Sequence, residues 1–490
     1  MIILVYTKFN SANIQDGLGS SEYSYYFVLH KFLPVLKAIG QIHEITDPVL
    51  EVDEYYEQAL KGGRKCVFLS FTAPHNVVVG LKCPTIPVFA WEYDTIPNER
   101  WGGNENNNWV DVLKKLGAAI THSVHSAEVI RSELGKGFPV ISCPSPIEAH
   151  YFASQQQISE KRPVLQYEAM LTKEVIDSAS LDPGQLSSEK GMAERIGITH
   201  VLLQKWAHEV LEDLMPKALY RLLRHTYLFT GTLIARSLRL FRSIKSKNRI
   251  KAGRLNTSTP LQGGRIQSDS HSFFISGIIY TSILNILDGR KNYKDMVAAF
   301  CHALKDKPDA ALILKTPVMA DLYFFKEEVF GFLNKLPDFN CRVVIIGYYL
   351  DNKAYHNLMK ATTFYVNTSY GEGQCLPLME YMAAGVPAIA PQSTAMRDYV
   401  SSSNAFLLKT STVPTFWQHD ERRAIRTVHH RPDWYSLVEA FQSSYQMAKN
   451  EPGAYQKMGI NAANTLQNHC SAEVIKMKLE NFLKNILKEQ

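Results

Sequence analysis

The chain has 490 residues, of which 46% are hydrophobic and 20% charged, and this composition excludes a disordered or fibrous protein. Its length suits two or three domains rather than one. The formal net charge of +6 is concentrated in residues 217–254, which contain eleven Lys or Arg and no Asp or Glu, so the rest of the chain is slightly acidic. This distribution excludes a uniformly basic nucleic-acid-binding protein.

The seven cysteines are scattered and form no C-x-x-C pair, which argues against a disulfide framework and against a zinc site. The first residues, MIILVYTK, have no basic region before their apolar run, so we expect a first β-strand rather than a secretory signal. No stretch of about eighteen uncharged apolar residues occurs, so a membrane-spanning helix is not expected. These features predict a cytoplasmic protein.

Short apolar runs alternate with longer helical patterns in the first half, which is typical of parallel α/β units. The expected strands are residues 2–6, 67–70, 88–91, 119–122 and 140–143. We therefore expect a doubly wound N-terminal domain over residues 1–150. After the first strand, Gly17, Gly19 and Ser20 form a glycine turn, and Ser20 or Ser21 can cap the helix that follows.

Polar side chains follow the later strands of this half. Glu92 and Asp94 come after the strand at 88–91, and either carboxylate could orient or deprotonate a hydroxyl if it faces a cleft. Capping of a neighbouring turn is an equally good interpretation. His122 lies at a strand end and is a weaker candidate, while His125 is expected on a helix surface.

The segment from residue 151 to 270 differs from both halves and is expected to be a helical basic insertion that ends in a linker. Its last part has the Ser/Thr/Gly/Lys composition of linkers. In residues 217–254, aliphatic and aromatic residues alternate with the eleven cations, as in a helix that lies in a membrane interface. We expect this segment to bind an anionic membrane surface. The alternatives are a helix packed on the protein body and RNA binding, for which no recognisable motif is present.

The second half repeats the α/β pattern, with expected strands at residues 279–287, 311–315, 343–346, 364–367 and 388–390. We expect a second doubly wound domain over residues 271–452, facing the first across a cleft. C-terminal helices are expected over residues 453–490, packing back on the N-terminal domain. Residues 464–487 show a continuous amphipathic helical pattern.

Cations follow two strands of this half. Arg290 and Lys291 lie in the turn of LDGRKNYKDMVAAF, and adjacent cations at a strand end suit an anionic diphosphate. A solvated turn is the alternative. Lys315 ends the strand at 311–315 and either lines the cleft or extends its ammonium into solvent.

The segment SYGEGQCLPLMEYMAAGVPAIAP, residues 369–391, combines a glycine turn with a helix start. Pro377 suits the first turn of a helix that stops at Gly385. Glu372 precedes this helix and Glu380 lies about one turn inside it, so the two carboxylates can reach different parts of one elongated ligand. Backbone N–H groups at the positive helix end can bind a phosphate or a sugar hydroxyl, and they belong to Gly373, Gln374, Cys375 and Leu376.

The pattern G-E-G-x-x-L-P-x-x-E-x-M-A-x-G-x-P in this segment resembles the E-x7-E signature of retaining glycosyltransferases of family 4, which have the GT-B fold. The resemblance covers residues 275–400 closely and residues 1–150 loosely. It implies that Glu372, with Gly373 and Gln374, holds the donor sugar. It also implies that Glu380 binds the ribose of the nucleotide.

The same resemblance implies roles at the diphosphate. Lys291 takes the place of the lysine that binds the donor phosphates. The family usually has an arginine where this chain has Asn285, and Arg290 could compensate for its loss. The glycine-rich loop with Gly19 and Ser20 would approach the diphosphate and shape the acceptor side.

The resemblance therefore implies a retaining hexosyltransferase that uses a nucleotide sugar and a glycan or lipid-linked acceptor in cell-surface polysaccharide or glycolipid assembly. We find no Asp-x-Asp after a strand and no His/Cys ligand spacing, so neither a metal nor a cofactor is expected. The alternatives are another GT-B enzyme, such as an epimerase or a phosphorylase, and a catalytically inactive scaffold that binds nucleotide sugars at the membrane. The predicted location is the inner face of the membrane.

Overall fold

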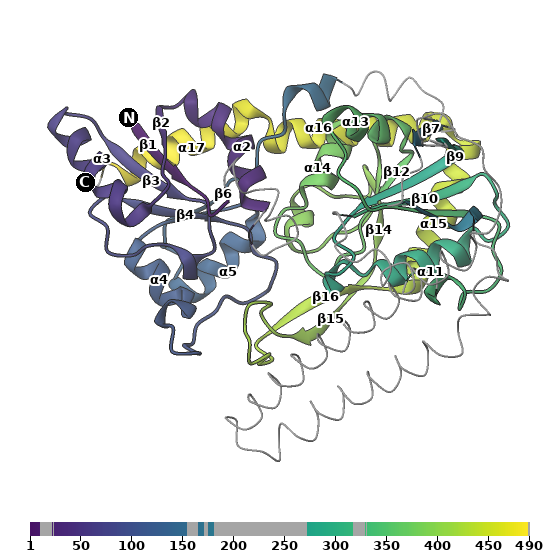
Figure 1. The fold of residues 1–490 in the computed structure, drawn as a ribbon, viewed down its shortest axis with the longest axis horizontal. Helices are drawn as coiled ribbons and strands as arrows, with labels where there is room; N and C mark the ends of the chain where they lie inside the picture. Colours follow the sequence, from purple (N-terminus) through teal and green to yellow (C-terminus); the bar gives the residue numbers. More distant parts are fainter. Residues whose placement is uncertain are drawn as a thin grey trace, which may run out of the picture. The chain divides into compact units, whose positions relative to one another are not determined.

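The computed structural model describes residues 1–9, 22, 24–153, 165–170, 175–180, 272–316, 329 and 331–488. Residues 1–179 and 270–490 form one unit, which contains two sheets built mainly of parallel strands (Figure 1). The candidate residues Gly19 and Ser20 and the basic segment 217–254 lie outside the described residues.

The N-terminal domain is built on a six-stranded parallel sheet of order β2-β1-β3-β4-β5-β6. Its strands are β1 (Ile2–Tyr6), β2 (Gln41–Glu44), β3 (Cys66–Ser70), β4 (Thr85–Phe89), β5 (Ala119–Thr121) and β6 (Val140–Ser142). Its helices are α2 (Ser24–Lys37), α3 (Pro48–Lys61), α4 (Trp109–Leu116) and α5 (Val124–Leu134). Ile3 of β1 packs in the same core as Phe32 of α2, while Leu4 packs with Val52 of α3. Because both faces are covered, most of the inner strands are apolar, which explains why the sequence predicted them. The edge strand β2 (QIHE) has no buried residue and was not predicted.

The C-terminal domain has a mixed sheet of order β14-β13-β12-β9-β10-β11-β8, in which β8 is antiparallel to β11 and β7 pairs antiparallel with β9. Its strands are β7 (Leu165–Met170), β8 (Val175–Asp177), β9 (Ser272–Ile283), β10 (Ala310–Lys315), β11 (Arg342–Ile346), β12 (Phe364–Val366), β13 (Ala388–Pro391) and β14 (Ala405–Leu408). A separate hairpin joins β15 (Thr410–Thr415) to β16 (Thr427–Pro432). The helices are α11 (Tyr293–Ala303), α13 (Asn352–Ala361), α14 (Leu376–Ala383), α15 (Trp434–Asn450), α16 (Pro452–Cys470) and α17 (Ala472–Ile486).

Helices cover both faces of this second sheet. Tyr280 of β9 contacts Phe300 of α11 and Phe441 of α15, with ring centroids 5.6 and 5.3 Å away. The neighbouring Ile279 points to the other face and shares a core with Leu358 of α13. Figure 1 shows α11 and α13 on opposite sides of the sheet. The alternation along β9 thus fixes which helix lies on which face.

The structure differs from the sequence-based expectation at several places. The expected strands did not include β2, β14 or the hairpin β15–β16. Residues 165–170 and 175–177 were expected in the helical insertion, but they are the strands β7 and β8. The strand expected at 279–287 is β9, which begins earlier, at Ser272, and ends earlier, at Ile283. The single helix expected over 464–487 is two helices, because the chain turns at Ser471, which has the extended backbone of a cap (φ −62°, ψ 156°). The second of these, α17, packs against α2 of the N-terminal domain.

Candidate functional site

The strand order of the C-terminal sheet reverses between β9 and β12, and the strongest candidate residues follow these two strands. In open parallel sheets, ligands bind at such a reversal, outside the carboxyl ends of the strands. Lys291 ends the short 3₁₀ turn Gly289–Lys291 after β9, and Glu372 follows β12. The Lys291 Nζ lies 2.7 Å from Glu372 Oε1. The fold thus joins two residues that lie far apart in the sequence.

The Glu372 carboxylate is buried and has two further hydrogen-bond donors. Ser369 Oγ donates to Oε1 at 2.6 Å and Asn367 Nδ2 at 3.3 Å. Burial alone would raise the pKa of Glu372, but the charges of Lys291 and Arg290 outweigh it and lower this pKa to about 2. Burial would likewise lower the pKa of Lys291, and Glu372 raises it instead. Both groups are therefore charged at neutral pH, in surroundings where a phosphate would interact strongly with the ammonium.

Arg290 supplies a second cation beside this pair. Its guanidinium lies 2.5 Å from a carboxylate oxygen of Glu92 and 3.1 Å from one of Asp288. It also donates to the Gly371 carbonyl oxygen at 3.1 Å. Asn285, which stands where an arginine was expected from the family pattern, instead accepts a backbone hydrogen bond within its own turn. The guanidinium at this site is therefore that of Arg290.

Glu92 and Asp94 come from the loop after β4 in the N-terminal domain. Burial raises the pKa of Glu92, and its partner Arg290 opposes that rise. Asp94 accepts a hydrogen bond from His430 Nε2 at 3.1 Å, and this bond is the largest cause that lowers the pKa of Asp94. The structure thus places Glu92 directly against the cations and Asp94 against a histidine of β16.

His122 and His125 are both buried. His122 Nδ1 lies 3.0 Å from the Cys143 carbonyl oxygen, and burial lowers the pKa of this imidazole to about 4. His125 Nε2 lies 3.2 Å from the Tyr93 carbonyl oxygen and 3.4 Å from Asp94 Oδ1. The expectation that His125 is a surface residue is wrong, because α5 directs this side chain towards the loop after β4.

The glycine turn before α14 touches the N-terminal domain. A Cβ atom on Gly373 would lie 2.7 Å from Ala90 Cβ, and one on Gly371 would lie 2.9 Å from the Glu92 carbonyl oxygen. Glycine is required for so close an approach. Cys375 then precedes α14 in the left-handed conformation, with φ 64°. The loop is therefore shaped by its contact with Ala90 and Glu92 as well as by its own turn.

Gln374 is fixed from the other domain. Its Oε1 accepts hydrogen bonds from the backbone N and the Oγ of Ser145, both at 3.2 Å. Its Nε2 is buried and has no hydrogen-bond partner among the residues that the structure describes. This amide is suited to donate to an acceptor atom of a ligand.

Glu380, on α14, is buried with an exposed fraction of 7%. Its Oε1 lies 2.6 Å from Lys31 Nζ of α2, and its Oε2 accepts from Tyr355 Oη of α13 at 2.5 Å. Lys31, Tyr355 and Ser145 were not predicted from the sequence. They lie in unrelated segments, and no motif connects them with residues 369–391.

Lys315 ends β10 and is buried, with an exposed fraction of 9%. Its Nζ donates to the Thr316 carbonyl oxygen at 2.5 Å. No carboxylate in the described part of the chain pairs with it. Burial lowers the pKa of Lys315 to about 8. It is therefore not a surface lysine, and it lies at the carboxyl edge of the sheet, one strand away from the reversal.

The hairpin β15–β16 was not predicted, and its tip contacts the loop after β4. Trp417 Nε1 donates to Thr95 Oγ1 at 3.2 Å, and Arg426 Nε lies 2.8 Å from Glu99 Oε1. β-Branched residues in TSTVPT and TVHHRP were the available signal for these strands. The hairpin of the C-terminal domain thus holds the loop that carries Glu92.

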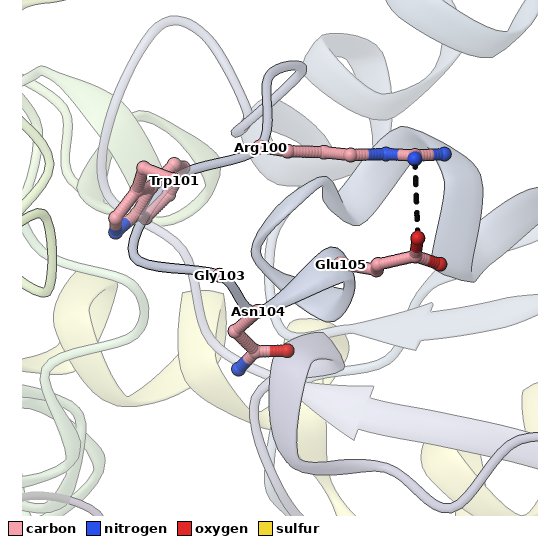
Figure 2. Close-up of a pocket in the computed structure, with 5 residues that line it drawn as sticks. All are labelled: Arg100, Trp101, Gly103, Asn104 and Glu105. Carbon is pink, nitrogen blue, oxygen red and sulfur yellow. Dashed lines mark hydrogen bonds and ion pairs between the residues drawn. The ribbon is translucent and has the colours of Figure 1, made fainter.

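A cavity of about 280 Å³ opens further along the same N-terminal loop (Figure 2). Figure 2 shows the ion pair between Arg100 and Glu105 on one side of it. Trp101, on another side, stacks on Trp417 with ring centroids 6.0 Å apart. The lining residues are Arg100, Trp101, Gly103, Asn104 and Glu105. None of the candidate residues for the diphosphate lines it, so this cavity is not the site described above.

Two further observations are limited to the described residues. They include no group of three or more His, Cys, Asp or Glu side chains that could hold a metal ion. No helix among them combines the length and the apolar character needed to cross a bilayer.

Residues 278–419 match the family model described as "Glycosyl transferases group 1". The matched range includes Arg290, Lys291, Glu372 and Glu380. This part of the chain is therefore similar to the group 1 glycosyltransferase domain. Within this domain, the predicted lysine and the two predicted glutamates lie on the elements that surround the strand reversal.

The chain is also similar to solved structures. The Anabaena protein HepE, in complex with UDP and glucose, is 10% identical with a TM-score of 0.52, covering 99% of this chain and 100% of that chain. Sucrose-phosphate synthase from Thermosynechococcus elongatus is 12% identical with a TM-score of 0.51, covering 100% of both chains. A glycosyltransferase from Rickettsia africae is 11% identical with a TM-score of 0.50, covering 100% of this chain and 99% of that chain. These similarities show the fold and confirm the predicted GT-B architecture. No curated protein matches this chain.

Proposed function

We propose that this chain is a retaining glycosyltransferase of family 4 that transfers a hexosyl group from a nucleotide sugar to a glycan or lipid-linked acceptor. The observation that carries the proposal is the pair of the partly buried Lys291 and the buried Glu372, 2.7 Å apart at the strand reversal, within the residues that match the group 1 glycosyltransferase model. Arg290 lies beside it, and Glu380 lies further along the helix that follows Glu372.

The chemistry of transfer explains why these residue types are needed. When the bond between sugar and diphosphate breaks, negative charge develops on the leaving diphosphate and positive charge on the sugar. Groups that are already fixed in place stabilise such charges most effectively. In this proposal, Lys291 and Arg290 stabilise the diphosphate, Glu372 holds the sugar, and Glu380 accepts hydrogen bonds from the ribose.

The acceptor side is assigned from the loop after β4. Glu92 and Asp94 come from the N-terminal domain, and their loop is held by β15–β16 next to the cations. We propose that the acceptor hydroxyl approaches from this side. The proposed attachment to an anionic membrane, through residues 217–254 on the cytoplasmic side, rests on composition alone.

Lys291→Ala and Glu380→Ala test the proposal directly. We expect each variant to lose on the order of 100-fold in turnover in a donor-hydrolysis and transfer assay with radiolabelled nucleotide sugars. Lys294→Ala is the matched control, because Lys294 is exposed and lies three residues further along the same segment. Thermal unfolding of each variant shows whether it is folded at the assay temperature. Wild-type rates in either variant would contradict the assignment.

Analysis of the labelled product separates the alternatives. Formation of a new glycosidic bond with the donor's anomeric configuration supports a retaining transferase. An epimerised nucleotide sugar or a sugar phosphate would instead indicate an epimerase or a phosphorylase. Binding of nucleotide sugars without turnover on any acceptor would indicate an inactive scaffold.

A further inference from the structure

The carboxylate of Glu380 is held from two directions by residues of different domains. Tyr355 Oη, on α13 of the C-terminal domain, donates to Oε2 at 2.5 Å. Lys31 Nζ, on α2 of the N-terminal domain, lies 2.6 Å from Oε1. Each carboxylate oxygen has two lone pairs. The Tyr151 hydroxyl also interacts with this carboxylate through a side-chain hydrogen bond. Together these donors fix the carboxylate plane and leave an acceptor position for a further hydroxyl.

Lys31 is itself well fixed. Only 11% of its side chain is exposed, and its Nζ also lies 3.4 Å from Glu148 Oε1 and 5.4 Å from the centre of the Tyr151 ring. Burial would lower the pKa of Lys31, but Glu380 and Glu148 raise it, so the ammonium is charged. A charged, immobile donor holds a buried carboxylate in one orientation.

A carboxylate held in one orientation by its neighbours presents its remaining acceptor position to a hydroxyl of a bound ligand. We infer that Lys31 and Tyr355 are positioning residues that present Glu380 to the hydroxyls of the donor ribose. This inference rests on the proposed function, which assigns the ribose to Glu380. It adds that an N-terminal residue prepares the nucleotide site of the C-terminal domain.

The same cross-domain arrangement occurs twice more at the site. Arg290 pairs with Glu92, and Gln374 with Ser145, again with one partner from each domain. Three of the candidate donor-binding side chains are therefore oriented by the N-terminal domain. Nucleotide affinity consequently depends on contact between the two domains as well as on the group 1 domain itself.

Calorimetric titration with ribonucleotides and their dideoxy analogues tests the inference. The probes are UDP, GDP and ADP, each compared with its 2′,3′-dideoxy counterpart. The variants are Lys31→Met, Lys31→Arg and Tyr355→Phe, and Lys37→Met is the control, since Lys37 is an exposed cation on the same helix.

We expect Lys31→Met to weaken binding of the preferred ribonucleotide about tenfold or more, the effect of losing a charge-assisted hydrogen bond. Its affinity for the dideoxy analogue should equal that of the wild type, because the diol through which Lys31 acts is missing. Lys31→Arg should restore most of the affinity. In the transfer assay, the KM for the donor should rise while kcat changes little.

Two results would overturn the inference: an unchanged ribonucleotide affinity in Lys31→Met, or an equal loss for the ribonucleotide and its dideoxy analogue. If Lys31→Met does not fold, Tyr355→Phe decides by the same comparison, since it removes one hydroxyl and keeps the ring. If the wild-type protein binds none of the three nucleotides, the proposed function fails, and this inference fails with it. If the wild-type protein binds a nucleotide and the Lys31 substitution leaves its affinity unchanged, only this inference fails.

Discussion

Lys315 carries a buried ammonium at the carboxyl end of β10, and among the described residues no carboxylate balances it. Burial lowers its pKa to about 8 from the ordinary value of 10.5. The unliganded protein therefore bears the cost of an uncompensated charge. Such a cost is expected where a residue is kept for an anionic ligand, which favours the interpretation of Lys315 as a cleft-lining, donor-binding residue.

Lys315→Met should therefore stabilise the unliganded protein at pH 7, by roughly 1–3 kcal/mol of unfolding free energy. Between about pH 8 and 10.5 the unfolded state binds more protons at this residue than the folded state does, so wild-type stability rises with pH in this window. The advantage of the variant should accordingly shrink from pH 8 towards 10.5. Denaturant unfolding measures it, with the exposed Lys353→Met as the control. A difference that does not change with pH would contradict this account.

Residues 369–391 show what could be predicted at the scale of single residues. Glu372 and Glu380 were identified because the turn, the helix start and both carboxylates lie in one short segment. Lys291 was identified from a second segment with its own pattern. Lys31 could not be predicted, because its contact with Glu380 depends on how the two domains are placed. Nothing in the sequence around Lys31 indicates a ligand.

The hairpin β15–β16 was not predicted, and it contacts the N-terminal loop that carries the acceptor-side candidates. Its tip places Trp417, with an exposed fraction of 1%, between the two domains, where the indole donates to Thr95. Beside it, Arg422 and Arg426 pair with Glu99, but these side chains are one-third to one-half exposed. Burial of the indole should therefore contribute much more to holding the loop than the ion pairs do.

Two substitutions compare these contributions. Trp417→Ala should reduce the free energy of unfolding by about 3–5 kcal/mol, because it leaves a large cavity. Glu99→Gln should change it by less than about 1 kcal/mol, because exposed ion pairs are weak. Equilibrium unfolding in urea measures both changes. Equal effects of the two substitutions would show that the ion pairs contribute as much as the indole and would contradict this account.

Elements were predictable where their pattern is strong. The parallel strands of both sheets are apolar runs that are buried on two faces, so the sequence marked most of them. β7 and β8 were missed because they lie in a polar stretch that was interpreted as part of the insertion. The break between α16 and α17 was missed because the helix is interrupted at Ser471 while the apolar pattern continues through this residue.

At the scale of the whole molecule, the site depends on contacts that run from one domain to the other. The GT-B fold was predictable, because both halves show alternating strands and helices and one segment carries the glycine–glutamate pattern. The pairing of Glu92 with Arg290 and of Lys31 with Glu380 was not predictable, because it depends on the relative placement of two separate sheets.

A crystal structure of the protein with the nucleotide sugar that most raises its melting temperature tests the central claim most directly. The account predicts that the diphosphate contacts Lys291 and Arg290, that the sugar contacts Glu372, and that the ribose hydroxyls contact Glu380. A nucleotide bound elsewhere, with these four side chains still paired as they are here, would contradict it.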